Sequence, residues 1–281
     1  MHHGKYKNYF EYLIINLYKI TESIKFKIMK IVSYNINGIR SGINKGFCNW
    51  IEKNKPDILC LQEIKAFPEQ INTKIFNKLG YNHYWAPSKR KGYSGVAILC
   101  KKIPIHVEYG IGLDSIDQEG RVLRVDLKNM SIISLYLPSG NDMVKRLNFK
   151  LFFMRNFFLY VKKIKYKLNH IIVCGDYNIC HHEIDIYDPI RNKKISGFLP
   201  IERKWMTHFI NLGFIDSFRN FVSEADHYSW WNYRYNARKN NKGWRIDYVM
   251  VSQSLKKKMK NAYLMPEVKF SDHCPVVLEI F

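Results

Sequence analysis

The chain has 281 residues, of which 47% are hydrophobic and 15% aromatic, and its 45 Lys and Arg against 24 Asp and Glu give a formal net charge of +21. A hydrophobic fraction of this size excludes intrinsic disorder, and a chain of this length buries a large core without disulfide bonds. The positive charge favours a polyanionic partner such as nucleic acid or an acidic membrane surface, although a solvated lysine-rich surface gives the same excess.

Residues 1–28 differ from the rest of the chain. They carry apolar residues at helix-like spacing, from Phe10 to Tyr18, with charged residues between them. The stretch is too short and too charged to span a bilayer, and it has no small-residue cleavage site of a signal peptide. We therefore treat 1–28 as an N-terminal extension of unassigned role and predict that the catalytic domain covers 29–281.

Short apolar runs alternate with longer amphipathic patterns through the rest of the chain. The runs predict strands at 30–36, 57–62, 94–100, 121–127, 131–137, 170–175, 245–251 and 275–280. The patterns predict helices at 67–79, 143–168 and 202–212, with Asn141-Asp142 as the N-cap of the second. Because strands and helices mix to the end of the chain, we expect one α/β domain.

The six cysteines include no Cys-x-x-Cys pair, and three of them lie in apolar runs. This usage indicates free thiols and a reducing compartment. The segment Cys180-His181-His182-Glu183 offers possible zinc ligands. Zinc sites usually take a second pair of ligands from another segment, and the sequence has none, so zinc is not favoured.

Polar residues stand at the ends or starts of six predicted strands. They are Asn35, Asn37, Glu63, Tyr136, Asp176, Asn178, Asp247, Asp272 and His273. If the last two strands run opposite to the others, these side chains meet at one rim of the sheets. Carboxylate and amide oxygens suit Mg²⁺ or Mn²⁺, and such an ion beside His and Asn donors is suited to attack of water on a phosphodiester. Each residue alone also fits a turn or a surface position, so the prediction depends on their combination.

Together these segments resemble the endonuclease/exonuclease/phosphatase superfamily, and within it the exonuclease III type of apurinic/apyrimidinic (AP) endonuclease. The resemblance covers about 29–281 and is carried by 34–38, 61–63, 136–138, 175–178, 245–248 and 271–275. It implies an α/β fold, a four-layered sandwich of two packed mixed β-sheets flanked by helices, with the active site at one end.

The resemblance also implies roles for the residues of the rim. Glu63 would be the principal Mg²⁺ ligand, with Mn²⁺ as a possible substitute, and Asn35 would anchor the metal shell and Asp176. Asp176 would align or deprotonate the attacking water, and Asn178 would donate to the phosphate. The implied metal set is Asn35, Glu63, Asp176, Asn178, Asp272 and His273.

Three further roles follow from the same resemblance. His273, held by Asp247, would assist at the scissile phosphate. Asp272 would order the leaving-group side or a second metal position, and Tyr136 would contact the phosphate or assist departure of the leaving group. The identity of the general base stays open, because the coupled groups titrate together.

A second stretch of the chain resembles the damage-recognition segment of AP endonucleases. Trp230, Trp244 and Ile246 match positions that form an apolar pocket for a flipped-out abasic sugar, although aromatic residues at such positions are also common in protein cores. Arg234, Tyr235 and Arg238 would contact DNA phosphates or wedge into the duplex. One departure is Ser139, where relatives usually carry Asn or Gln, so one phosphate contact is expected to be weaker.

The implied function is that of a Mg²⁺-dependent, class II AP endonuclease that cuts duplex DNA 5′ to abasic sites and processes blocked 3′ ends. We expect a cytoplasmic monomer without a membrane partner. The alternatives are mainly 3′→5′ exodeoxyribonuclease activity, a lipid-phosphate phosphodiesterase on the same fold, and a non-catalytic DNA-binding module. The tryptophans argue against the lipid substrate, and the intact Glu63, Asp176, Asp247 and His273 argue against the binding module.

Overall fold

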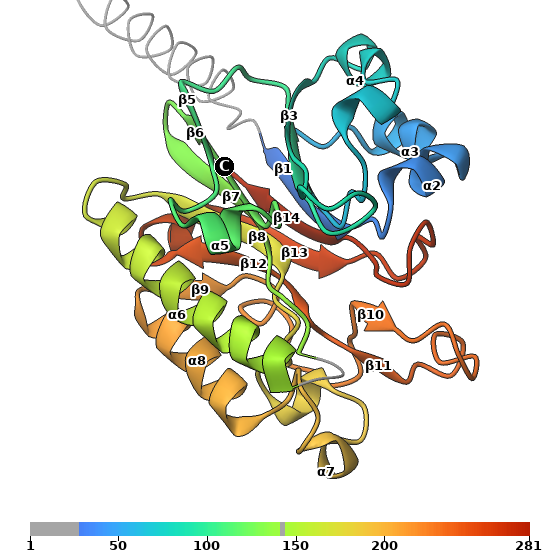
Figure 1. Cartoon of the computed structure of the whole chain (residues 1–281), viewed down its shortest axis with the longest axis vertical. Helices are drawn as coiled ribbons and strands as arrows, with labels where there is room; N and C mark the ends of the chain where they lie inside the picture. The colour runs from blue at the N-terminus through green and yellow to red at the C-terminus, as the bar shows by residue number, and fades with distance from the viewer. Residues whose placement is uncertain (1–27, 141–143) are drawn as a thin grey trace, which may run out of the picture.

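Two six-stranded β-sheets pack face to face, and helices cover both outer faces (Figure 1). This computed structural model describes residues 28–140 and 144–281. The first sheet has the strand order β13-β14-β1-β2-β4-β3. Its strands are β1 (Met29–Asn35), β2 (Ile58–Gln62), β3 (Asn82–Ala86), β4 (Val96–Cys100), β13 (Met259–Leu264) and β14 (Val276–Ile280).

The second sheet has the strand order β5-β6-β7-β8-β12-β9. Its strands are β5 (His106–Tyr109), β6 (Val122–Leu127), β7 (Met130–Tyr136), β8 (Ile171–Asp176), β9 (Phe214–Asp216) and β12 (Asp247–Ser252). A separate two-stranded ribbon of β10 (Trp230–Trp231) and β11 (Gly243–Trp244) lies at one end of the sandwich (Figure 1).

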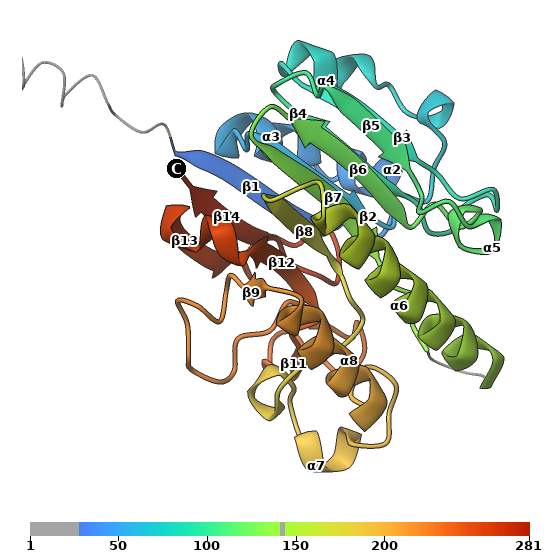
Figure 2. The ribbon, with the colours of Figure 1, turned by 90° about the vertical axis from the view of Figure 1, so that its left-hand side faces the viewer.

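The helices form the two outer layers. They are α2 (Ile39–Asn44), α3 (Phe47–Asn54), α4 (Lys74–Lys78), α5 (Asp114–Asp117), α6 (Val144–Lys165), α7 (Pro189–Asn192) and α8 (Pro200–Asn211). Short 3-10 turns are η1 (Pro68–Gln70), η2 (Glu183–Asp185) and η3 (Gln253–Lys258). In Figure 2 the long helix α6 lies along the second sheet together with α8, while α2, α3 and α4 lie against the first. The predicted four-layered α/β sandwich is confirmed.

The alternation of side chains along each strand divides the core into three apolar layers. In β8, Ile172 and Cys174 point into the layer between the sheets, whereas Ile171 and Val173 pack beneath α6 and α8. The first sheet alternates in the same way between the central layer and the layer under α2, α3 and α4. Because both faces of these strands are buried, they carry continuous apolar runs.

The strand directions bring the polar strand ends to one rim. β1 and β2 are parallel, as are β7 and β8, whereas β14 is antiparallel to β1 and β12 is antiparallel to β8. The carboxyl ends of the first four strands therefore lie beside the amino ends of the last two. Asp176 and Asp247 are register partners across β8 and β12.

The eight predicted strands are the eight interior strands of the two sheets, and the four edge strands β3, β5, β9 and β13 were not predicted. The helix predicted at 67–79 is confirmed only over α4, because the extended Ile71 separates α4 from the 3-10 turn η1. Helices α6 and α8 are confirmed. The predicted N-cap at Asn141-Asp142 and residues 1–27 of the predicted extension lie outside the described residues.

Among the described residues, no helix combines the length and the apolar character that a membrane crossing requires.

A buried ion-pair network fixes the start of β12, the strand that carries Asp247. The guanidinium of Arg245 donates to both carboxylate oxygens of Asp185, at 2.7 and 3.0 Å, and to Asp216 at 2.7 Å. Arg219 also donates to Asp185, at 2.6 Å. Burial by itself would raise the pKa of Asp185, but the two guanidinium groups outweigh it and hold that pKa well below its usual range.

We expect this network to make the protein acid-sensitive. Because the pKa of Asp185 is lower in the folded than in the unfolded protein, its contribution is complete above about pH 4 and is lost as the pH falls below that value. At pH 7 the free energy of unfolding of Asp185→Asn should therefore be lower than that of wild type by more than about 1.4 kcal/mol, the value of one pKa unit. Between pH 5 and pH 3 the free energy of unfolding should fall less in the variant than in wild type. Urea unfolding at each pH measures both, with the exposed Asp114→Asn as control. Parallel pH profiles for wild type and Asp185→Asn would contradict the expectation.

Candidate active site

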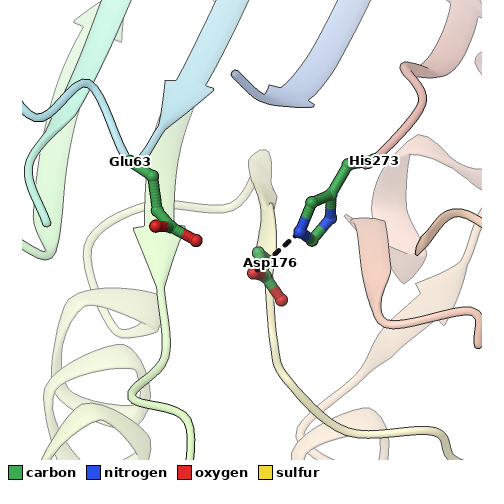
Figure 3. A group of neighbouring side chains, drawn as sticks. All are labelled: Glu63, Asp176 and His273. Carbon is green, nitrogen blue, oxygen red and sulfur yellow. Dashed lines mark ion pairs between the residues drawn. The ribbon is translucent and has the colours of Figure 1, made fainter. Parts of the chain in front are cut away.

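Two carboxylates and an imidazole from three separate segments face one another at the rim of the sheets. Glu63 follows β2, Asp176 ends β8 and His273 precedes β14 (Figure 3). One ligand atom from each of the three lies within 4.8 Å of the other two. The structure thus brings together residues that are 210 positions apart in the chain, as expected if the last two strands reverse direction.

Glu63 is held by an amide and by an ammonium group. The side-chain amide of Asn35 donates to Glu63 Oε1 at 2.8 Å, and Lys65 Nζ lies 2.7 Å from Glu63 Oε2. Lys65 also donates to the side-chain oxygen of Asn37 at 2.5 Å. Burial would raise the pKa of Glu63, but the charge of Lys65 and the bond from Asn35 lower it below its usual value. Glu63 is therefore a carboxylate at neutral pH.

Asp176 lies at the centre of the site and is almost completely buried. Asn35 donates to its Oδ2 at 2.9 Å, and the backbone N–H of Asn178 donates to its Oδ1 at 2.8 Å. Burial first, and then the nearby negative charges of Asp247 and Glu63, raise the pKa of Asp176 to about 8. The cluster of carboxylates thus carries more negative charge than the protein cations around Asp176 compensate.

His273 is aligned by a buried carboxylate. Its Nδ1 lies 2.8 Å from Asp247 Oδ2, and the same oxygen accepts a bond from the hydroxyl of Ser229 at 2.7 Å. The other nitrogen, Nε2, faces Asp176 Oδ2 at 4.0 Å. Burial would lower the pKa of His273, but Asp247 outweighs it, followed by Asp176 and Asp272, and the pKa rises to about 10. The imidazole is therefore a cation that donates to Asp247 and presents its second N–H to the site.

Tyr136, at the end of β7, lies beside Glu63 and under a buried arginine. The guanidinium of Arg121 lies 4.4 Å from the centre of the Tyr136 ring and donates to its backbone oxygen at 3.1 Å. Burial and the charge of Glu63 raise the pKa of Tyr136 well above its usual value. The phenol is therefore neutral and remains a proton donor at physiological pH.

Asp272 uses both carboxylate oxygens within the protein. Oδ1 accepts from the side-chain amide of Asn37 at 2.8 Å, and Oδ2 accepts from the indole N–H of Trp230 at 2.9 Å. Burial would raise its pKa, but the charge of His273 and these two bonds lower it. Asp272 lies outside the group of Glu63, Asp176 and His273 that could share one ion. Through these two hydrogen bonds Asp272 links the rim of the sheets to the ribbon of β10 and β11.

Several residues around the site have left-handed backbone conformations that non-glycine residues rarely adopt. Asn37, Glu63, Lys65, Ser94 and Asn178 all have φ between 46° and 51°. Such positions are unfavourable by about 1–3 kcal/mol each and persist where the surrounding contacts hold them. Here the hydrogen bonds of Asn35, Lys65 and Asp176 provide those contacts.

An apolar cluster adjoins His273. The rings of Trp230 and Trp244 meet edge to face at 5.9 Å between centroids, and Ile246 packs with them. Trp230 also forms a β-bridge with His273. The cluster is completed by Cys180, Ile186 and Phe198, which were not predicted. The three residues matched to a lesion pocket therefore do come together, and they lie directly beside the carboxylate–imidazole group.

The residues expected to contact DNA divide into two kinds. Arg234 and Tyr235 lie in the turn between β10 and β11 and are exposed, with Tyr235 88% exposed. Arg238 instead donates to the backbone oxygens of Pro266, Val268 and Ser271 and covers the ring of Trp231 at 4.6 Å. Arg238 therefore braces two loops, and its expected contact with DNA stays a prediction.

The unfavoured zinc alternative finds no support among the described residues, where Glu63, Asp176 and His273 form the group that could hold an ion. The side chain of Cys180 packs in the apolar cluster and His181 Nε2 lies 2.8 Å from the hydroxyl of Thr207. Burial lowers the pKa of His181 to about 4.

A divalent cation fits the chemistry of the rim. Glu63 and Asp176 offer carboxylate oxygens close to each other, and the raised pKa of Asp176 reports uncompensated negative charge at that point. A cation between these oxygens would relieve that charge, and oxygen ligands of this kind suit hard divalent ions. The residues present therefore fit a metal ion.

The model of the Endonuclease/Exonuclease/phosphatase family matches residues 32–273, and the chain belongs to this family. It is therefore an enzyme that hydrolyses phosphodiester bonds, in a family whose members depend on metal ions. The resemblance to exonuclease III-type AP endonucleases is confirmed.

Individual relatives cover nearly the same part of the chain. An exodeoxyribonuclease of Bacillus subtilis is 39% identical over 254 residues, which are 90% of this chain and 99% of that protein. DNA repair nuclease APEX1 of Danio rerio is 38% identical over 253 residues, covering 89% of this chain and 81% of that protein. Among solved structures, an AP endonuclease from Archaeoglobus fulgidus is 27% identical with a TM-score of 0.83, covering 90% of this chain and 99% of that one.

Proposed function

We propose that this enzyme is a Mg²⁺-dependent DNA repair nuclease that cuts duplex DNA on the 5′ side of abasic sites and also removes nucleotides or blocking groups from 3′ ends. The observation that carries the proposal is the contact between two features: the Glu63, Asp176 and His273 group, and the apolar cluster of Trp230, Trp244 and Ile246. A phosphodiester held at the first would place a neighbouring sugar at the second.

Glu63 and Asp176, with Asn35 between them, would hold the Mg²⁺ ion, and Mn²⁺ has the same ligand preferences. When bound, the ion acts as a Lewis acid and neutralises negative charge on the phosphate. Asn35 keeps the two carboxylates at a fixed separation because its single amide nitrogen donates to both. Without the ion, the negative charge of the two carboxylates would repel the phosphate of the substrate.

The protein's own groups would carry the proton and position the water. Asp176 would accept a hydrogen bond from the attacking water, align it with the phosphorus atom and take up its proton as the new P–O bond forms. This alignment lowers the entropic part of the barrier. The imidazolium of His273, oriented by Asp247, donates its Nε2–H to a non-bridging phosphate oxygen as charge develops there. Asp247 keeps that proton on Nε2 available by accepting from Nδ1.

Other site residues would act on the leaving group and on the turn that follows β8. The neutral phenol of Tyr136 donates to the phosphate or to the departing oxygen. Asn178 donates to Asp176 at 3.3 Å and to the backbone oxygen of Leu137 at 2.9 Å, so it orients Asp176, and its donation to the phosphate stays a prediction. Asp272 fixes Trp230 and Asn37, and through them the leaving-group side.

The apolar cluster would supply the selectivity. A sugar without a base exposes mainly its ring carbons and costs less to extrude from the duplex, whereas an intact nucleotide needs room for its base. Arg234 and Tyr235, which are exposed in the turn that links the two tryptophan strands, would contact the DNA backbone or groove together with Arg238.

The test is an incision assay on a 5′-labelled duplex that carries one abasic-site analogue, in Mg²⁺ and in EDTA. One Mg²⁺-dependent cut immediately 5′ to the lesion is expected. A ladder that shortens from the 3′ end would assign the main activity to 3′→5′ exonuclease, and hydrolysis of lipid phosphates without DNA cleavage would overturn the proposal.

We expect Trp244→Ala to lower the rate of incision at the abasic site by at least about tenfold, because it opens the apolar wall beside the sugar. Removal of nucleotides from a paired 3′ end should fall less. Trp244→Phe is the matched control, since it keeps an apolar ring, and the two rates are measured on the same protein samples together with their thermal unfolding. Equal loss of both activities would contradict the role of the pocket.

We also propose that the enzyme acts as a monomer, that its domain covers 29–281, and that it works in the cytoplasm. All six cysteines are free and buried, which supports a reducing compartment. Sedimentation of the purified protein at several concentrations tests the monomer.

A further inference from the structure

The site rests on a fully buried ion pair that the chemistry proposed above does not use. Lys150 of α6 and Glu202 of α8 have no exposed side-chain surface, and Lys150 Nζ lies 2.6 Å from Glu202 Oε1. Both residues belong to the helical layer on the outer face of the second sheet. Removing two charges from water is costly, and their attraction offsets that cost only where further hydrogen bonds satisfy both groups.

Lys150 holds the turn that carries Asp176. Its Nζ donates to the backbone oxygen of Asn178 at 2.8 Å. Asn178 has a φ of 50°, in the left-handed region, which asparagine enters more readily than most other non-glycine residues. From this position its backbone N–H and its side-chain N–H both reach the Asp176 carboxylate. The ammonium group therefore fixes the orientation of Asp176 through one carbonyl.

Glu202 holds the segment beneath the apolar cluster. Its Oε2 accepts from the backbone N–H groups of Gly197, at 2.6 Å, and Leu199, at 3.0 Å, and its Oε1 accepts from the hydroxyl of Ser196 at 2.8 Å. Gly197 has a φ of 102°, and a Cβ added there would lie 2.7 Å from the ring of Trp244.

Gly197 also contacts the turn that carries Asp176 and Asn178, which we call the catalytic turn. The same added Cβ would lie 3.3 Å from the backbone oxygen of Asn178, so the glycine backbone fits between that carbonyl and the Trp244 ring. The contacts run without a break from Asp176 to Asn178, Lys150, Glu202, Gly197 and Trp244.

We propose that Lys150 and Glu202 are positioning residues that hold the catalytic turn and the floor of the lesion pocket in one frame, and so set both the rate of incision and its selectivity for abasic sites. This inference rests on the proposed function. It assigns the buried pair to catalysis, not to stability, because neutral residues of similar shape commonly replace such a pair without loss of stability.

The test uses the double variant Lys150→Met/Glu202→Gln, which removes both charges and keeps an acceptor oxygen for Gly197. We expect the single-turnover rate of incision at an abasic analogue to fall by about 10–100-fold, because a displacement of a catalytic group by an ångström has effects of this size. The dissociation constant for DNA should change by less than about threefold, and the unfolding temperature should stay close to that of wild type. Lys163→Met, an exposed lysine on the same helix, is the matched control and should change none of these values.

A second measurement distinguishes positioning from a merely structural role. In an Asp176→Ala background the double substitution should lower the remaining rate by less than about threefold further, because its effect passes through the orientation of the Asp176 carboxylate. The ratio of abasic incision to 3′-end removal should also fall in the double variant. The milder Glu202→Gln alone should give a several-fold loss in the same direction, which keeps the test valid if the double variant folds poorly.

The outcomes separate this inference from the proposed function. If wild type cuts at the abasic site and the folded double variant cuts at the wild-type rate, the positioning role is overturned while the function stands. If the losses in the Asp176→Ala background are additive, the pair does not act through Asp176 and the inference is also wrong. If wild type does not cut at the lesion, the proposed function itself fails.

Discussion

Asp176→Asn is expected to reduce incision by about 10²–10⁴-fold, the usual contribution of a group that handles a proton in a hydrolytic site. The same substitution should make the metal-free protein more stable. Since the pKa of Asp176 is about 8 when folded and near 4 when unfolded, the folded protein binds a proton that the unfolded chain releases in this range. Wild type therefore loses stability through this group as the pH rises from about 4 to about 8, and the neutral Asn does not.

Thermal unfolding in EDTA at pH 5, 6, 7 and 8 measures the effect, with a rise of about 2–4 °C for each kcal/mol regained. The difference between the variant and wild type should widen with pH, and added Mg²⁺ should stabilise wild type more than the variant. The exposed Asp114→Asn is the control for loss of a negative charge. A variant that is less stable than wild type at pH 8, or that retains normal incision, would show that Asp176 has another role.

Arg245→Met should destabilise the protein by about 3–5 kcal/mol, the largest stability effect that we expect from a single substitution. The change removes the guanidinium that holds Asp185 and Asp216, and it leaves Asp185, which is completely buried, with less compensation for its charge. It also removes the cation that lies 4.4 Å from the centre of the Tyr248 ring. Urea unfolding at pH 7 gives the free energy of unfolding directly.

The control is Arg155→Met, which removes the same charge from an exposed position on α6 and should change stability by less than about 0.5 kcal/mol. The double variant Arg245→Met/Asp185→Asn should recover part of the loss, because the buried charge disappears together with its partner. If the double variant is no more stable than Arg245→Met alone, the loss comes from packing of the arginine stem and not from the stranded carboxylate.

The interior of the fold could be predicted because its strands are buried on both faces. The runs around Ile172 and Val249 are apolar at successive positions, and such runs indicate a central strand without any knowledge of its neighbours. The edge strands carry no such pattern. β13, with Lys260 and Asn261 exposed, and β5, with both ends exposed, are strands because of the neighbour they pair with, and pairing is not visible in a local pattern.

The site could be predicted where a polar residue interrupts an apolar strand end, as Glu63 and Asp176 do. It could not be predicted where the partner belongs to another layer. Lys150 lies in an amphipathic helix and looks like a solvated lysine, but it is buried because Glu202 of α8 meets it across the layer. Lys65 could have been predicted as a site residue, since it stands two residues from Glu63 at the same strand end.

Arg238 makes contacts that its sequence pattern does not reveal. Its neighbours Arg234 and Tyr235 are exposed as expected, and an arginine in such a turn commonly contacts phosphate. The carbonyl oxygens of Pro266, Val268 and Ser271, in a loop about thirty residues away, accept hydrogen bonds from its guanidinium, and its contact with DNA stays a prediction. Sequence patterns show that a group can donate a hydrogen bond, but the acceptor that receives it depends on the folded chain.

The buried cysteines give the molecule internal probes of its own opening. Cys60, Cys100 and Cys174 lie between the sheets, Cys48 under the helices of the first sheet, Cys180 in the apolar cluster and Cys274 beside His273. A thiol reagent can reach each position only when the layer around it separates, so the rate of labelling at each cysteine reports the frequency of that particular opening. Bound DNA would slow labelling most at Cys180, because this cysteine lies in the apolar cluster. The three cysteines between the sheets would be labelled only when the whole domain unfolds. The untagged enzyme can therefore show, layer by layer, which parts of its structure a substrate holds closed.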